Sequence, residues 1–197
     1  MIYYLILQKN QFNTGYYGWI SNKLIKSDII KENKLKFDKN IVLAEDLDFF
    51  VKVYSCASTF YFLNYNTFNY LQEAENSSFF QKKIDYYMQL IIHLRIKEFL
   101  ELNNKFINEN KSILEQRIRD YVFYIVFYED LNISKIENEV NRVYENKTIT
   151  KNITLNYVPT FKNIIVFLVT KNKFREIYRL LLMRNKARKI AKGIMGE

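Results

Sequence analysis

The chain of 197 residues contains one cysteine, one histidine, one proline and four glycines, and these shortages exclude several classes of site. With Cys56 alone, an internal disulfide and a cysteine-based metal cluster are excluded. With His93 alone, zinc sites built from several histidines are excluded and a Ser-His-Asp triad is disfavoured. Because His93 lies in an apolar helical run, we expect it to be packed or half-exposed rather than catalytic. The few glycines leave little material for a Gly-rich phosphate loop.

Long hydrophobic runs are also missing from the sequence. No apolar stretch approaches the roughly 20 residues that a membrane-spanning helix needs. The N-terminal segment MIYYLILQKN lacks the basic start of a signal peptide. We therefore expect a cytoplasmic protein. Hydrophobic residues still make up 49% of the chain and aromatic residues 17%, which is enough to bury a core.

The net charge of +9 favours anionic partners such as nucleic acid, anionic lipid or phosphorylated substrates. Lysine and arginine concentrate between Lys171 and Lys192, where apolar residues recur every three to four positions. Such a basic amphipathic helix indicates either a membrane-surface element or a solvated basic face on a helix that packs on the core. Nucleic acid ranks last, because the charge is spread thinly elsewhere and no nucleic-acid-binding motif is present.

The first 80 residues show patterns of both strands and short helices. Ser27 is placed to cap a helix that ends near Asn33. The segment from Leu35 to Phe37 alternates apolar residues with lysine, as a short exposed strand does. Thr59 to Tyr70 alternates as well and is rich in β-forming residues. These patterns predict an α/β region.

The rest of the chain has helical periodicity. Four helical regions are expected, of which the last is broken near Lys171-Asn172. They span Ile84 to Phe106, Ser112 to Glu129, Ser134 to Tyr144 and Phe161 to Ile194, with a polar connector from Asn146 to Tyr157. We therefore divide the chain into residues 1–80 and an all-helical C-terminal region, residues 81–197.

An acidic pair, Glu45-Asp46, stands where the apolar run Ile41 to Ala44 gives way to a helical period. The apolar face of that helix comprises Leu47, Phe50, Val51, Tyr54 and Ala57, with Asp48 and Lys52 off it. The unpaired N–H groups and the dipole at a helix N-terminus stabilise negative charge, so a carboxylate there suits a general base. Ordinary capping explains the same spacing more simply.

An ordered set of motifs across residues 14–80 resembles the second half of family 2 glycosyltransferases of the GT-A fold. The set comprises Trp19, Asn22-Lys23-Leu24, the short helix from Ser27, Phe37, Glu45-Asp46, the Tyr-rich strand Tyr65 to Tyr70 and the loop Asn76-Ser77-Ser78. The resemblance implies an α/β region that is part of a GT-A fold, followed by the helical C-terminal region.

The resemblance also implies roles for individual residues. Asp46 would be the base that takes the proton from the acceptor hydroxyl as it attacks a nucleotide-sugar, and Glu45 would orient the acceptor or the base. Trp19 would give a sugar ring a flat apolar wall, and Asn22 and Lys23 would complete the acceptor site. One carboxylate suffices for an inverting single displacement.

The sequence departs from that family in its donor side. The nucleotide-binding half and its metal-binding D-x-D precede the resembling segment in the family and are not matched here. Asp46-Leu47-Asp48 spells D-x-D, but Trp19 and Asn22 stand upstream of it at the distance that the later motif expects. We therefore expect no cofactor or metal in this chain, while the complete enzyme would use Mg²⁺ or Mn²⁺ with a nucleotide-sugar. The chain would be truncated, and its partner would be the missing half or a second copy.

The combined hypothesis is a glycosyltransferase-like protein of capsule or exopolysaccharide synthesis. It would transfer sugar to a glycan or lipid-linked acceptor at the inner face of the cell membrane, which the segment from Lys171 to Lys192 would contact. The alternative is a non-enzymatic helical module that binds membrane or another protein.

Overall fold

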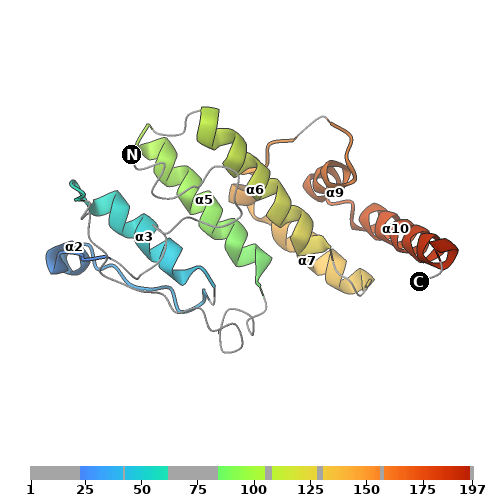
Figure 1. The fold of residues 1–197 in the computed structure, drawn as a ribbon, viewed down its shortest axis with the longest axis horizontal. Helices are drawn as coiled ribbons and strands as arrows, with labels where there is room; N and C mark the ends of the chain where they lie inside the picture. Colours follow the sequence, from blue (N-terminus) through green and yellow to red (C-terminus); the bar gives the residue numbers. More distant parts are fainter. Residues whose placement is uncertain are drawn as a thin grey trace. The chain divides into compact units, whose positions relative to one another are not determined.

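The computed structural model describes residues 23–41, 43–61, 84–104, 108–127, 131–155 and 158–195. Within these ranges all the regular structure is helical, and no residue lies in a strand (Figure 1). The helices are α2 (Ser27–Glu32), α3 (Glu45–Cys56), α5 (Tyr86–Leu102), α6 (Asn108–Val126), α7 (Ile133–Glu145), α8 (Lys147–Asn152), α9 (Phe161–Thr170) and α10 (Phe174–Met195).

The chain forms two compact units, residues 1–114 and 115–197, which divide within α6. The first unit contains α2, α3 and α5, and the second contains α7 to α10. The boundary that the sequence predicts after residue 80 lies outside the described residues.

The predicted α/β region, with its likeness to part of the GT-A fold, is wrong for the part of the chain that the structure describes. Neither Leu35 to Phe37 nor residues 59–61 form a strand. The physical reason is that Leu35 packs against the core of the first unit, while the ring of Phe37 stacks on that of Phe49, 4.2 Å between centroids. The apolar side chains of Leu35 and Phe37 are thus packed by the helical core of the first unit, and the segment does not need to pair with a strand. Residues 62–70, which hold the remainder of the predicted strands, lie outside the described ranges.

The core of the first unit is built where α3 and α5 lie side by side (Figure 1). The predicted apolar face of α3 is confirmed for Leu47, Phe50, Val51 and Tyr54, which are all buried. Ala57, the fifth member of the prediction, is the C-cap and is half-buried. The four buried side chains pack with Ile41 of the preceding loop, with Phe49 and Val53 of α3, with Ile92, Ile96, Phe99 and Leu100 of α5, and with Leu114 of α6. Burial of each such side chain stabilises the folded state by about 1.5–3 kcal/mol, so the packing of α3 makes a large contribution to the stability of this unit.

The ends of the first helices follow local hydrogen bonding. Asp85 caps α5, because its carboxylate accepts from the N–H groups of Tyr87 and Met88 at 3.0 and 3.2 Å. The predicted cap of α2 is wrong: Ser27 is its first helical residue, and the capping position is held by Lys26 without a side-chain hydrogen bond.

The second unit packs α10 against α7 and α9, while α8 and α9 also contact α7. Its core is made of Ile136, Val140 and Val143 of α7, Ile165, Val166 and Val169 of α9, and Ile177 and Leu181 of α10. The predicted break is confirmed between α9 and α10, where Asn172 takes a left-handed φ of 53°. Helix α8 was not predicted; it lies within the expected polar connector and is capped by Asn146, whose side chain accepts from the N–H of Ile149.

No helix in the described ranges combines the length and the apolar character that crossing a bilayer requires.

Candidate functional site

The first turn of α3 carries three carboxylates, those of Glu45, Asp46 and Asp48. Ala44 occupies the N-cap in the left-handed conformation, with φ of 68°, and makes no side-chain capping bond. The first N–H groups of α3 have no acceptor within the helix, as at any helix N-terminus. They therefore contribute positive potential at this end of α3. The N-cap side chain does not cap this helix, and the preference of a helix N-terminus for negative charge is enough to account for carboxylates in its first turn.

Helix α5 fixes the position of this turn. The side chain of Gln89 is buried, and its amide nitrogen donates to the carbonyl oxygen of Leu43 at 2.9 Å. Leu43 stands two residues before α3, so the hydrogen bond sets where the helix begins. Leaving the buried amide of Gln89 without this hydrogen bond would cost about 1–3 kcal/mol, which favours this one position of Leu43 relative to α5.

Two of the predicted site residues are close in space although they come from separate segments. Burial lowers the pKa of Lys23, and the nearby carboxylate of Asp46 acts in the opposite direction. The ammonium nitrogen of Lys23 also lies 4.7 Å from the ring centroid of Phe50, one helical turn beyond Asp46. One side of α3 thus brings together a carboxylate and an ammonium group.

The remaining predicted site residues fall into two groups. Glu45 is half-buried in the same turn as Asp46. Trp19 and Asn22 lie outside the described residues, as does the loop Asn76-Ser77-Ser78. The structure therefore places Glu45 and Asp46 in one helical turn, has the charge of Asp46 act on Lys23, and does not bear on the proposed sugar-stacking wall.

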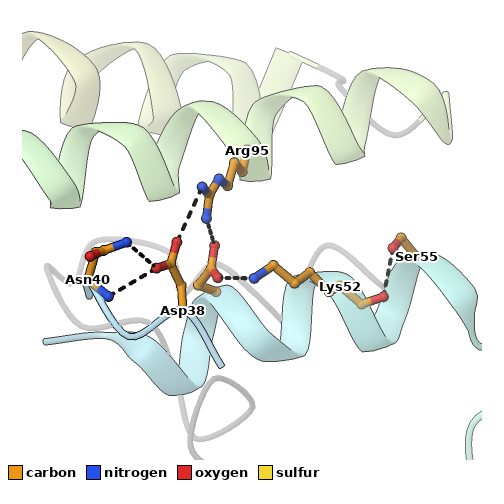
Figure 2. Close-up of polar contacts among 6 residues, drawn as sticks. Asp38, Asn40, Lys52, Ser55 and Arg95 are labelled. Carbon is orange, nitrogen blue, oxygen red and sulfur yellow. Dashed lines mark hydrogen bonds and ion pairs between the residues drawn. The ribbon is translucent and has the colours of Figure 1, made fainter. Parts of the chain in front are cut away.

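Asp48 has a role that the sequence did not reveal. Its side chain is only 1% exposed, and its two oxygens are ion-paired with Lys52 Nζ, at 2.5 Å, and with the guanidinium of Arg95 (Figure 2, where these two partners are labelled). The expectation that Asp48 lies off the buried face is therefore wrong. A buried carboxylate requires such partners, because the desolvation of an unpaired charge costs several kcal/mol.

The loop before α3 joins the same group of charges. Arg95 Nη2 lies 3.8 Å from Asp38 Oδ2, and the backbone N–H and side-chain amide of Asn40 both donate to Asp38 Oδ1 (Figure 2). The pKa of Asp38 is lowered chiefly by the backbone hydrogen bond from Asn40, with Arg95 and Lys52 acting in the same direction. The loop, α3 and α5 are thus held together by alternating charges.

His93 is packed, as predicted from its apolar surroundings in the sequence. It is 2% exposed, and its Nδ1 donates to the carbonyl oxygen of Gln89 at 2.8 Å. Across the described ranges, no three His, Cys, Asp or Glu side chains are grouped so that they could hold a metal ion.

The arrangement of Asp46 and Lys23 suits a ligand that carries hydroxyl groups. The carboxylate can accept a hydrogen bond and then a proton from a hydroxyl, while the ammonium can donate to a neighbouring oxygen. The ring of Phe50 is 1% exposed, so it can hold the ammonium group of Lys23 by a cation–π contact but cannot itself contact a ligand.

Comparison of the chain with protein-family models, with curated proteins and with solved structures found no match.

Proposed function

We propose that the first turn of α3 is the acceptor side of a sugar-transfer site, in which Asp46 is the base. The observation that carries the proposal is the position of Lys23 over the ring of Phe50, one helical turn from Asp46, close enough for the two charges to interact. The motif resemblance assigned Asp46 as the base and Lys23 as part of the acceptor site. The resemblance supplies the class of reaction, and the geometry around Asp46 supplies the candidate chemistry. A GT-A fold is not part of the proposal.

In this reaction the acceptor hydroxyl donates a hydrogen bond to the carboxylate of Asp46. Its oxygen attacks the anomeric carbon of a nucleotide-sugar, the bond from that carbon to the diphosphate breaks, and the diphosphate leaves with the electron pair. The hydroxyl proton passes to Asp46 and then to water. The configuration at the anomeric carbon inverts, because there is one displacement and no covalent intermediate.

Lys23 and α3 both place positive potential beside the carboxylate of Asp46. The dipole of a helix contributes about 0.3–1 kcal/mol to the stability of an anion in its first turn. Lys23 is positioned to hold a second oxygen of the acceptor, which would fix which hydroxyl faces Asp46. We place the reaction in the cytoplasm, on a glycan or lipid-linked acceptor of surface polysaccharide.

Acceptor binding can be measured without a sugar donor. The full chain is titrated calorimetrically with a panel of oligosaccharides and short lipid-linked sugars, as wild type and as Asp46→Asn. A hydrogen bond to a charged group contributes about 1.5–3 kcal/mol, so Asp46→Asn should weaken binding by roughly tenfold to a hundredfold.

The matched control for this titration is Asp28→Asn. Asp28 also stands in the first turn of a helix, but it is exposed on α2. The control should bind as the wild type does. Equal affinity of wild type, Asp46→Asn and Asp28→Asn for every glycan that binds, or no binding at all, would contradict the proposal.

A further inference from the structure

Helix α10 has two different faces. Ile177 and Leu181 are 0% and 2% exposed and belong to the core that α10 shares with α7 and α9. The opposite side, which we call the outer face of α10, carries exposed residues at helical spacing. These residues are Arg175, Arg179, Met183, Lys186 and Ile190. The outer face extends over about 22 Å, at about 1.5 Å per residue.

Core packing does not account for the apolar residues of the outer face. Met183 is 67% exposed and Ile190 is 64% exposed. Ile190 lies on the opposite side of the helix from the buried Ile177 and Leu181. Met183 and Ile190 are seven residues apart, about two helical turns, so they lie on the same side of α10 as the three cations of the outer face.

The surroundings of the outer face are strongly basic. Between residues 171 and 195 the sequence has nine lysines or arginines and a single acidic residue, Glu176. Within the described part of the chain, none of the three cations of the outer face is ion-paired to a carboxylate.

Arg184, which faces inward on α10, is also affected by the neighbouring positive charges. Arg184 lies over the rings of Phe127 and Phe161, at 5.3 and 4.4 Å from their centroids. Burial lowers its pKa, and the charge of Arg188 lowers it further. An anionic partner would relieve this repulsion along α10.

We propose that the outer face of α10 binds the surface of a membrane that contains anionic lipid. Its three cations would contact the headgroups, while Met183 and Ile190 would enter the boundary between headgroups and acyl chains. A nucleic acid would use the cations but would gain nothing from two exposed aliphatic side chains among them. The inference is independent of the proposed sugar transfer, since it concerns the other compact unit.

The test uses the full chain and vesicles, because removing α10 would also remove Ile177 and Leu181 from the core. Binding to phosphatidylcholine vesicles with and without phosphatidylglycerol is measured by co-sedimentation at two salt concentrations. The wild type should bind the anionic vesicles, and binding should weaken as salt screens the charges.

The charge variant combines Arg175→Gln, Arg179→Gln and Lys186→Gln. Each basic residue near an anionic surface contributes about fivefold in affinity, so the triple variant should bind on the order of a hundredfold more weakly. The control combines Lys135→Gln, Lys147→Gln and Lys151→Gln, three exposed positions on α7 and α8. It removes the same net charge from the same unit and should keep most of the binding.

The apolar variant combines Met183→Ser and Ile190→Ser and should weaken binding by roughly tenfold, since it removes the groups that enter the membrane. Its control is Ile133→Ser with Val158→Ser, which are 42% and 57% exposed. Circular dichroism checks that each variant keeps its helix content.

Three results would overturn the inference. The first is an equal loss for the charge variant and its control, which would mean that net charge alone drives binding. The second is equal binding to vesicles with and without phosphatidylglycerol. The third is a charge variant that loses binding to a single-stranded oligonucleotide while its binding to vesicles is unchanged.

Discussion

Removing Arg95 should destabilise the first unit, because it leaves the carboxylate of Asp48 buried with one partner fewer. The change is Arg95→Met, which keeps much of the aliphatic length of the side chain. Asp48 is 1% exposed, whereas the side chains of Arg95 and Lys52 are 38% and 33% exposed. The positive charge of Arg95, which the substitution removes, is thus partly solvated, whereas the negative charge of Asp48, which remains, is buried.

The magnitude follows from this asymmetry. Breaking a fully buried ion pair by removing one partner costs about 3–5 kcal/mol. Lys52 still compensates Asp48, and Arg95 is partly screened by water, so we expect about 2 kcal/mol. Replacing both partners, as Asp48→Leu with Arg95→Met, removes the buried charge itself. The double variant should therefore cost about 1–2 kcal/mol less than the sum of the two single variants.

The assay is urea denaturation followed by circular dichroism, together with hydrogen exchange resolved by peptide. Exchange should accelerate in α3 and α5 and stay unchanged in α7 and α9, which belong to the other unit. The matched control is Arg142→Met on α7. That arginine is 45% exposed and lies 3.7 Å from Glu139, a surface pair that contributes at most about 1 kcal/mol.

The reasoning about Asp48 would be refuted by either of two results. One is additivity of the two single variants in the double variant, which would show that the charges do not interact. The other is an Arg95→Met protein whose exchange in α3 equals that of the wild type.

Three further predictions concern α3 and the loop before it. Phe50 is 1% exposed, so Phe50→Ala should lower the free energy of unfolding by about 3–5 kcal/mol in the same urea assay. Ala44→Gly should be neutral or raise it by up to about 1 kcal/mol, since glycine accepts the φ of 68° without a steric cost; a clear loss would contradict this. The folded-state pKa of Asp38 lies below its ordinary value of 3.8, so its contribution to stability is complete above that pH and is lost as the pH falls through the lower pKa. Acid denaturation of wild type and Asp38→Asn should therefore converge at low pH, and a constant difference would contradict the assignment.

The helices could be predicted from the sequence because their apolar residues repeat with the helical period. Helix α3 is the clearest case, since its buried Leu47, Phe50 and Tyr54 stand at that spacing. Helix α8 could not be predicted, since its six residues bury only Ile149 and depend on the cap from Asn146. The predicted strand at Leu35 to Phe37 failed for a related reason: alternation describes any extended segment, and only a hydrogen-bonded partner makes it a strand.

The candidate site was predictable only in part. The position of Asp46 follows from the start of the helical period, whereas its proximity to Lys23 depended on the motif order and on the fold of the preceding loop. The burial of Asp48 was missed because an aspartate four residues before a lysine is typical of an exposed helical pair. Its second partner, Arg95, lies 47 residues away, and no local pattern joins the two.

The central claim is that Asp46 accepts the proton of the acceptor hydroxyl during sugar transfer. It is tested most directly by joining the chain to a nucleotide-sugar-binding polypeptide and measuring turnover with Asp46→Asn and with Asp28→Asn. General-base catalysis contributes about 10²–10⁴-fold, so Asp46→Asn should lose at least about a hundredfold in turnover while the affinity for the nucleotide-sugar stays the same. Turnover by Asp46→Asn equal to that of Asp28→Asn would contradict the claim.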